Sequence, residues 1–414
     1  MTLQDRINAL VALGNRLHDL DNDERIATAI RKTTHNNSWF THDNQRLALT
    51  EIRDHFLNES ALNAWLKPYF SQKKALNDEN TEGSFDFGFR IFDVGSATQN
   101  PKRETQNLIE SQILEVGSAT QNPKLEAQNL KRVGLVLAGN IPLVGFHDIL
   151  CVFVAGHQSV IKLSDKDPFL LPMLLDFLKE IDAQTAAYFS TTTERLGSFD
   201  AVIATGSNNS ARYFEAYFGK YPNIIRKNRN AIAILRGTET AEELRLLGND
   251  IFQYFGLGCR NVSKLYLPKG YNFTLLLETL HERNDIVMHD KYKNNFDYNF
   301  TLLILNKIKY ESNGCLLMRE AEEIASPISM VYYEFYDDLK DLTKTLQAKK
   351  DQIQLIVASF SDTDVVTRRD AMHRVSTAMP IENLKTFNFG EAQKPSLSDY
   401  ADGVDTLQFL LELE

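Results

Sequence analysis

Several hallmarks of metal-binding, secreted and membrane proteins are missing from this sequence of 414 residues. It has only three cysteines, Cys151, Cys259 and Cys315, which are far apart and lie outside any CxxC or His-spaced pair. This spacing argues against a disulfide framework and against a zinc site, so no metal is expected. No run of 18 apolar residues is present, so no membrane span is expected. The first twenty residues carry acids and an amphipathic pattern, unlike a signal peptide.

An excess of positive charge is also missing. The chain has 45 Lys and Arg against 55 Asp and Glu, a net charge of −10, so its overall field attracts neither nucleic acid nor an anionic membrane. Hydrophobic content of 43% and charged content of 24% are ordinary for a globular protein, and the length suggests two or three lobes. These absences together predict a reduced, cytoplasmic protein that binds no nucleic acid.

The N-terminal ninety residues have a helical pattern. Leu10, Leu13, Leu17 and Leu20 repeat at helical spacing, and Thr41 is placed to cap a later helix. A polar segment, DVGSATQNPKRETQNL, is then nearly repeated as EVGSATQNPKLEAQNL, with Val94 and Val116 at the same position of the two copies. Two copies are too few for a solenoid, so we expect an exposed insert outside the lobes.

From Lys131 onward short apolar runs alternate with helical segments, which predicts a parallel sheet with crossover helices. Strands are expected at 133–137, 160–163, 201–204 and 231–235, as neighbours in one sheet, and a second set of elements follows Thr238. The expected organisation is an N-terminal helical region packing on a nucleotide-binding lobe, the insert, that lobe, a catalytic lobe, and a C-terminal segment returning to the first lobe: 1–92, 93–130, 131–236, 237–372 and 373–414.

One cysteine occupies an unusual place. In IFQYFGLGCRN, Cys259 follows Gly-Leu-Gly, and glycine on both sides of Leu257 suggests an unusual backbone conformation or a close approach by another group. A buried structural cysteine at a helix end is the simpler interpretation of this position alone. A reactive thiol needs partners elsewhere in the chain.

Four other motifs offer such partners, each weak when taken alone. In AGNIPL, Asn140 stands where a strand turns into a helix and could aim its amide at an oxyanion, with Pro142 in the first helical turn. The alternative is an asparagine chosen for turn geometry. The remaining candidates are a lysine at a strand end that could hold ribose hydroxyls or simply snorkel, a Gly-Ser pair that could receive a phosphate at a helix start, and a glutamate before a proline turn: Lys162 in VIKLSD, Gly206 and Ser207 in ATGS, and Glu323 in EEIASPI.

The order and spacing of these five motifs are more specific than any one of them. AGNIPL, VIKLSD, ATGS, FGLGC and EEIASPI resemble the aldehyde dehydrogenase superfamily, and within it the acyl-CoA reductases of the LuxC type, the fatty-acid reductases. RVGLVLAGNIPLVGFHDIL, GLGCRNVSKLYLP, NSWFTHDNQRLAL and DGVDTL are similar to that branch. The resemblance covers almost the whole chain except the insert. It implies an α/β fold with a Rossmann-type nucleotide-binding lobe and an α/β catalytic lobe.

The resemblance also implies roles for individual residues. Cys259 falls on the nucleophile and Asn140 on the oxyanion-hole amide. The cofactor, NADPH or NADH, would be held by residues at the family's ribose and phosphate positions: Lys162, Ser164, Asp165, Gly206, Ser207 and Glu323. The substrate would be acyl-CoA or another acyl thioester, with coenzyme A as part of it, and a homo-oligomer is left open. His147 lies seven positions after Asn140, so one helix would place both on one face; a packed histidine is at least as good an interpretation.

One departure from the family pattern bears on the reaction. Oxidising aldehyde dehydrogenases usually carry Glu-Leu-Gly-Gly at the start of the catalytic lobe, where the glutamate activates a water. The matching stretch here, KNRNAIAIL, has no glutamate, which favours thioester reduction. The rivals are a CoA-acylating or acid-forming aldehyde dehydrogenase and a non-catalytic nucleotide-binding relative. Asp165 stands where many relatives have glutamate, so the choice between NADH and NADPH stays open.

Overall fold

The computed structural model describes residues 1–77, 130–359 and 384–413. The predictions for the duplicated insert, and those for residues 360–383, therefore lie outside the described residues. Residues 1–65 and 130–414 form one compact unit, and residues 66–129 form another, of which only the end of helix α4 is described.

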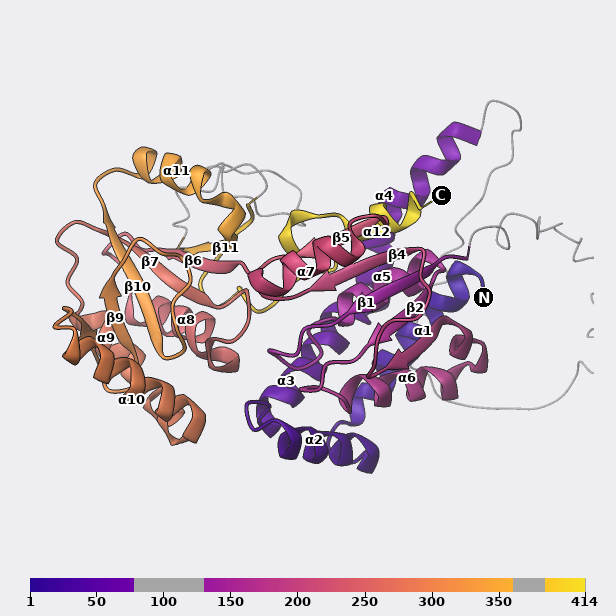
Figure 1. Cartoon of the computed structure of the whole chain (residues 1–414), viewed down its shortest axis with the longest axis horizontal. Helices are drawn as coiled ribbons and strands as arrows, with labels where there is room; N and C mark the ends of the chain where they lie inside the picture. The colour runs from indigo at the N-terminus through magenta and orange to yellow at the C-terminus, as the bar shows by residue number, and fades with distance from the viewer. Residues whose placement is uncertain (78–129, 360–383, 414) are drawn as a thin grey trace, which may run out of the picture. The chain divides into compact units, whose positions relative to one another are not determined.

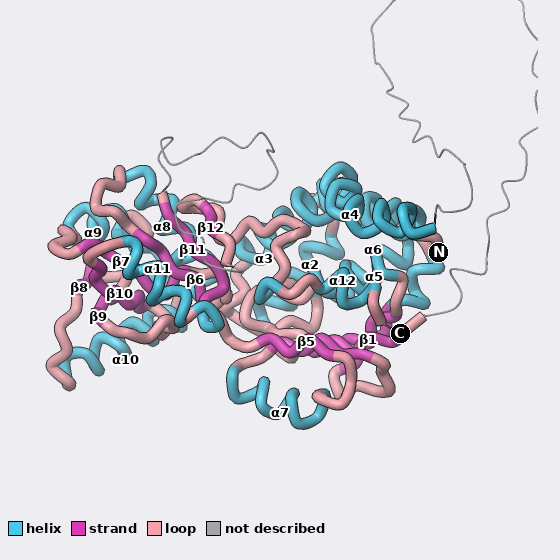
Figure 2. The backbone as a smooth tube through the Cα atoms, turned by 90° about the horizontal axis from the view of Figure 1, so that it is seen from above, coloured by secondary structure: helices cyan, strands magenta, loops and turns pink. Residues whose placement is uncertain are grey.

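The described chain contains two sheets (Figures 1 and 2). The first has the order β3-β2-β1-β4-β5, with every neighbouring pair parallel. The second has the order β12-β11-β6-β7-β10-β9-β8, with only the β8–β9 pair antiparallel. The strands are β1 (Arg132–Val136), β2 (Gln158–Lys162), β3 (Phe189–Thr192), β4 (Ala201–Thr205), β5 (Asn223–Arg226), β6 (Asn230–Ile234), β7 (Val262–Pro268), β8 (Glu311–Ser312), β9 (Leu317–Glu320), β10 (Met330–Tyr336), β11 (Ile353–Ala358) and β12 (Thr386–Phe387).

Helices precede, connect and follow these strands. They are α1 (Leu3–Arg16), α2 (Glu24–Asn36), α3 (His42–Glu51), α4 (Glu59–Asn77), α5 (Phe146–Ala155), α6 (Leu170–Ile181), α7 (Asn208–Phe218), α8 (Ala241–Phe252), α9 (Thr274–His281), α10 (Asp290–Leu305), α11 (Leu339–Ala348) and α12 (Thr406–Leu411). The predicted cap is confirmed, because the Thr41 side chain accepts a hydrogen bond from the Asn44 N–H at the start of α3. Within the described ranges, no helix combines the length and apolar character that a membrane crossing requires.

The N-terminal helices pack on helices that flank the first sheet. α1 contacts α5 and α6, and α2 contacts α6. Their leucines face inward as predicted, with Leu10, Leu13 and Leu17 almost completely buried. Arg16 adds an ion pair with Glu180 of α6 at 2.8 Å.

The sequence prediction for residues 231–235 was right about the strand and wrong about its sheet. β6 pairs with β7 and β11, so it belongs to the second sheet rather than standing beside β1, β2 and β4. The change of sheet therefore falls between β5 and β6. A short run of alanine and isoleucine fits the interior of any parallel sheet, and only long-range pairing decides which one.

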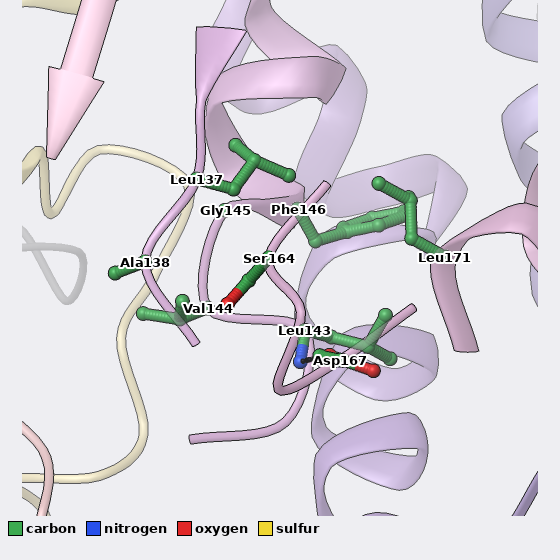
Figure 3. A pocket seen from close by; sticks show the side chains of 9 residues that line it. All are labelled: Leu137, Ala138, Leu143, Val144, Gly145, Phe146, Ser164, Asp167 and Leu171. Atoms are coloured by element: carbon green, nitrogen blue, oxygen red, sulfur yellow. Dashed lines mark hydrogen bonds between the residues drawn. The ribbon is translucent and has the colours of Figure 1, made fainter. Parts of the chain in front are cut away.

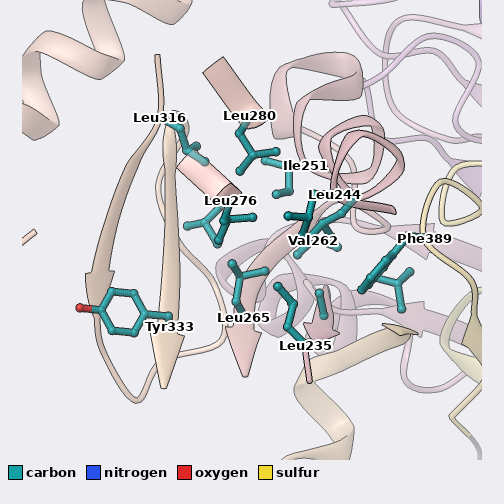
Figure 4. Packing of buried hydrophobic residues seen from close by; sticks show 14 of the residues in the cluster. Leu235, Leu244, Ile251, Val262, Leu265, Leu276, Leu280, Leu316, Tyr333 and Phe389 are labelled. Carbon is teal, nitrogen blue, oxygen red and sulfur yellow. The ribbon is translucent and has the colours of Figure 1, made fainter. Parts of the chain in front are cut away.

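The second sheet has a closely packed apolar core (Figure 4). Helices α8 and α9 cover one of its faces with Leu244, Ile251, Leu276 and Leu280. Helix α11 covers the opposite face, where its leucines Leu342 and Leu346 pack with residues of β6 and β11. The strands of the second sheet are thus closely packed between helices on both faces.

The C-terminal residues contact elements of both sheets. β12 pairs with β11 of the second sheet. α12 packs on α5, and His157, which follows α5, makes a 2.9 Å hydrogen bond through Nε2 to the Leu410 carbonyl. Trp65 donates from Nε1 to the Tyr400 hydroxyl at 2.7 Å.

Candidate active site

Cys259 lies on a tightly wound loop between α8 and β7. After α8 ends, Tyr254 and Phe255 adopt left-handed backbone angles, φ 52° and φ 59°, and Gly256 follows at φ 74°. Left-handed conformations cost about 1 to 3 kcal/mol at a residue with a side chain, so the surrounding contacts must impose them. The sequence prediction of an unusual backbone around Leu257 is confirmed for Gly256.

A buried asparagine holds this loop together. Asn261 is 1% exposed, and its Nδ2 donates to the carbonyls of Asp250 at 3.0 Å and Gln253 at 2.8 Å. Its Oδ1 accepts the Gly258 N–H at 2.8 Å. A Cβ on Gly258 would lie 2.9 Å from that oxygen, so the second glycine is explained by a close approach. The role of Asn261 could not be predicted from the sequence, because nothing in the stretch CRN distinguishes a buried, hydrogen-bonded asparagine from a polar residue at the surface.

Cys259 is partly buried, whereas Cys151 and Cys315 are buried. Cys151 lies inside α5, and burial raises the pKa of the Cys315 thiol to about 11. Burial also raises the pKa of Cys259, but the charges facing it act in both directions. Arg260 and Arg226 lower the pKa of this thiol, while Asp402 raises it. Cys259 is therefore the one of the three thiols that is both partly exposed to solvent and close to arginine side chains.

Arg260 is held against the C-terminal segment. Its Nε donates to the Ala392 carbonyl, and its guanidinium carbon lies 5.0 Å from the centre of the Phe387 ring. The same segment is tied to Asp250 of α8, whose carboxylate accepts the N–H groups of Gly390 at 2.7 Å and Ala392 at 3.0 Å. The cation beside Cys259 is thus fixed by chain that follows much later in the sequence.

The structure brings the AGNIPL turn to this loop. Asn140, in the turn after β1, donates from Nδ2 to the Leu257 carbonyl at 2.8 Å. The Ile141 side chain comes within 3.7 Å of the point where a Cβ on Gly258 would stand. The Asn140 Oδ1 is buried and has no hydrogen-bond partner among the described residues. Two segments that are far apart in the sequence, Gly139–Leu143 and Leu257–Cys259, thus lie in contact.

Two local predictions about this turn were wrong. Helix α5 begins at Phe146, so Pro142 precedes the helix instead of occupying its first turn. For the same reason Asn140 and His147 do not share a helix face. His147 is packed: its Nε2 bonds the Leu397 carbonyl at 2.8 Å, and the rings of Phe56, Trp65 and Tyr400 surround it. Burial lowers the pKa of His147, which favours the neutral ring.

The VIKLSD residues form the end of β2 and the start of the loop after it, at the carboxyl edge of the first sheet. Lys162 ends β2, and its Nζ donates to the Thr193 carbonyl at 3.3 Å. The Ser164 Oγ accepts the Lys166 N–H at 3.3 Å and stands where a side chain on Gly139 would have to go. Asp165 is exposed, and its carbonyl accepts from the Asn36 side chain at 2.8 Å.

Gly206 and Ser207 lie between β4 and α7. Ser207 caps α7, and its Oγ accepts the Ser210 N–H at 3.2 Å. The strand order reverses between β1 and β4, so the turn with Asn140 and the turn with Gly206 flank the switch point of the first sheet. Ligands of open parallel sheets bind outside the carboxyl ends of the strands at such points.

Glu323 is an exposed residue of the loop between β9 and β10, whose backbone is fixed by three side chains. The carbonyl of Ala321 accepts from the Lys264 Nζ, that of Glu322 from the Lys349 Nζ at 2.8 Å, and that of Ile324 from the Ser263 Oγ at 2.7 Å. Ser263 and Lys264 follow Cys259 closely on β7, so one strand links the two loops. The convergence of Glu323 with Lys162 and Gly206 stays a prediction.

No group of three or more histidine, cysteine or acidic side chains that could hold a metal ion occurs in the part of the chain that the structure describes.

Comparisons with known proteins agree with this geometry at the level of the fold. Comparison with models of known protein families gives no match. A long-chain acyl-protein thioester reductase of Aliivibrio fischeri is 24% identical over 165 residues, a stretch that covers 36% of this chain and only 34% of that protein.

Solved structures match over more of the chain. An acetylating aldehyde dehydrogenase from Geobacillus thermoglucosidasius matches with a TM-score of 0.54 and 11% identity, covering 96% of this chain and 86% of that one. Aldehyde dehydrogenase 21 from Physcomitrella patens matches with a TM-score of 0.54 and 13% identity, covering 87% and 74%. At these identities the likeness concerns the fold, and the chain has the aldehyde dehydrogenase fold.

Proposed function

We propose that this protein reduces an acyl thioester, acyl-CoA in the simplest case, to an aldehyde through a covalent acyl group on Cys259, using NADPH or NADH. The observation that carries the proposal is the contact between Asn140 and the Cys259 loop, in which the Asn140 Nδ2 donates to the Leu257 carbonyl at 2.8 Å. It joins an amide donor to the loop that carries the one thiol of the three that is not fully buried.

The protein's own part in acyl transfer follows from these groups. The Cys259 thiolate attacks the thioester carbonyl carbon, a new C–S bond forms, and the carbonyl electron pair moves onto oxygen. The asparagine amide carries a second N–H, and together with the Cys259 backbone N–H it would stabilise that oxyanion. The oxyanion then collapses, the C–S bond to coenzyme A breaks, and the leaving thiolate takes up a proton. The acyl group stays on Cys259.

The nucleotide-facing residues fit a nicotinamide dinucleotide. Lys162 would hold ribose hydroxyls, and the N-terminal N–H groups of α7 behind Gly206 and Ser207 would receive phosphate. Glu323 would accept a hydrogen bond from the nicotinamide ribose. The bound cofactor supplies the hydride that releases the acyl group as aldehyde.

Two features favour a thioester substrate over aldehyde oxidation. One relative is named an acyl-protein thioester reductase and a structural relative is named an acetylating aldehyde dehydrogenase. In addition, the stretch from Lys227 through β6 has no glutamate to activate a water. The next carboxylate in the sequence, Glu239, is 9% exposed and accepts the Arg236 and Gly237 N–H groups, which occupies it in a turn.

Two other functions compete with this one: the CoA-acylating reaction, in which an aldehyde and NAD⁺ give acyl-CoA, and nucleotide binding without catalysis. The hydrogen bond that joins Asn140 to the loop with Cys259 weighs against the second.

One assay separates these functions. Purified protein is mixed with NADH or NADPH and with acetyl-, octanoyl- or palmitoyl-CoA, and the reduced-nicotinamide absorbance is followed. We expect oxidation of the nicotinamide, with one free coenzyme A released per nicotinamide consumed. Cys315→Ala, which removes a buried thiol, serves as the matched control and should retain the activity. Turnover only with aldehyde, coenzyme A and NAD⁺ would assign the reverse reaction, and no turnover with any pair would leave nucleotide binding alone.

A further inference from the structure

The turn that carries Asn140 is held in a conformation that its own sequence disfavours. Leu143 has φ 55°, in the left-handed region, and its side chain is 6% exposed. Leucine rarely adopts this conformation because its Cβ crowds the following carbonyl. A contact from outside the turn must therefore select it.

Asp167 makes that contact (Figure 3). Its Oδ2 accepts the Leu143 N–H at 2.9 Å, and the residue is 8% exposed. Its own backbone N–H donates to the Ser164 carbonyl at 3.0 Å, so the carboxylate is fixed in the loop that also contains Ser164 and Asp165. A carboxylate loses its hydration when it is buried, so a buried aspartate is better explained by a hydrogen-bonding role than by packing alone. Burial raises the pKa of Asp167 to about 6, while the N–H groups of Leu143 and Leu170 act to lower it.

The same turn touches three other groups. On one side, Gly139 lies against Ser164, whose Oγ would be 2.1 Å from a Cβ at residue 139. On the other side, the Asn140 amide bonds the Leu257 carbonyl and Ile141 packs near Gly258. The turn is thus fitted between the loop after β2 and the loop with Cys259.

We infer that Asp167 is a positioning residue for the Asn140 amide: by accepting the Leu143 N–H, it locks the strained turn that aims this amide at the Cys259 loop. The inference rests on the proposed function, in which Asn140 stabilises the oxyanion. In this inference Asp167 touches neither the substrate nor the cofactor, and it acts only through the turn. The loop after β2, which contains Asp167, would then assist the acylation step in addition to being a candidate binding site for ribose.

A structural role alone is the alternative, since Asp167 also lies just before α6 and faces the Leu170 N–H. The two roles differ in which reaction of Cys259 they affect. Acylation by a thioester passes through an oxyanion and needs Asn140. Alkylation by iodoacetamide is a displacement at a saturated carbon and forms no oxyanion. A positioning role therefore slows acylation and spares alkylation, whereas damage to the thiol loop slows both.

The experiment measures both rates on Cys259 by intact-protein mass spectrometry, without nicotinamide, using octanoyl-CoA and iodoacetamide as probes. The proteins are the wild type, Asn140→Ala, Asp167→Ala, Asp167→Asn and the double variant Asn140→Ala/Asp167→Ala. We expect Asn140→Ala to slow acylation about a hundredfold. Asp167→Ala should slow it about tenfold or more, because a displaced catalytic group loses much of its effect. Asp167→Asn keeps an oxygen acceptor and should stay within about threefold of the wild type.

The double variant is decisive. If Asp167 acts through Asn140, the double variant acylates within about twofold of Asn140→Ala, because the second change removes nothing that is still in use. Multiplicative losses in the double variant, or slowed alkylation in Asp167→Ala, would overturn the inference. If Asp167→Ala is poorly folded by thermal unfolding, Asp167→Glu replaces it, since it keeps the charge but moves the acceptor. Wild-type acylation in Asn140→Ala, or no acylation of Cys259 at all, would instead reject the proposed function.

Discussion

The two halves of the candidate site are built differently. On the thiol side, Cys259 lies in a loop that is clamped from within by Asn261, which is 1% exposed, and joined to Asn140 by a hydrogen bond across the chain. On the proposed coenzyme side, Asp165 and Ser207 are exposed, and Ser207 is engaged mainly by its near neighbour Ser210.

This difference matches the demands of the proposed chemistry. A covalent step needs the thiol and its amide donor within tenths of an ångström, so preorganisation by buried contacts is favoured. A dinucleotide makes many separate contacts, and each of them can tighten when the ligand binds. The comparison implies that substitutions on the thiol side cost rate and stability, whereas substitutions on the coenzyme side cost affinity.

The largest expected effect is that of Cys259→Ala. It should abolish acyl transfer and reductase turnover, because no other group can carry the acyl intermediate. Binding of the nicotinamide dinucleotide, measured by its fluorescence, should stay within about twofold of the wild type, since the thiol contributes little to holding it. Turnover of acyl-CoA by this variant at the wild-type rate would exclude covalent catalysis. A parallel loss of dinucleotide binding would show that the two sides are not separable.

Asn261→Ala tests whether the buried hydrogen bonds of Asn261 stabilise the loop that carries Cys259. It leaves the Gly258 N–H and the carbonyls of Asp250 and Gln253 without their buried partner, which should lower the free energy of unfolding by about 2 to 4 kcal/mol. Urea denaturation measures this loss. Asn306→Ala is the matched control, because the Asn306 amide makes one exposed bond, to the Leu302 carbonyl at 2.8 Å, at a helix end. Equal stability losses in the two variants would contradict the special role of Asn261.

Part of the fold and of the candidate site could be predicted from the sequence alone. Motif order was enough to predict that the turn with Asn140 and the loop with Cys259 would meet, and alternation of apolar runs was enough to find β1, β2, β4 and β6. The sheet to which β6 belongs depends on pairing with β7 and β11, which no local pattern specifies. The left-handed Leu143 and its partner Asp167 gave no signal either, since leucine is a poor candidate for that conformation and an aspartate before proline suggests only a turn.

Lys162→Met addresses the coenzyme side. The lysine is partly exposed and makes one bond, to the Thr193 carbonyl at 3.3 Å, so its removal should not destabilise the fold. We expect the dissociation constant for the dinucleotide to rise about tenfold, while Cys259 acylation in its absence is unchanged. Lys166→Met, an exposed neighbour in the same loop, provides the control. An effect on acylation instead of binding would reverse the division between the two sides.

The most gradual expected effect is a pH dependence arising from Asp250. Burial raises the pKa of this carboxyl from 3.8 to about 7, against the opposing effect of the Gly390 and Ala392 N–H groups. The folded protein therefore retains a proton that the unfolded chain loses, so this contribution to stability is complete below about pH 4 and is lost as the pH rises toward 7. Its slope is at most about 1.4 kcal/mol per pH unit. Asp250→Asn should flatten the pH dependence of urea denaturation in that window, and an unchanged curve would show that Asp250 ionises normally.

The placement of the C-terminal segment has a consequence for protein synthesis. Arg260 bonds Ala392 and Asp250 bonds Gly390, so the surroundings of the thiol are completed by chain that the ribosome makes long after Cys259. While the chain is still growing, the thiol loop has left the ribosome without the segment that fixes its neighbouring cation. The proposed acyl transfer is therefore a property that the nascent chain acquires late, once residues 386–397 have been released and have docked.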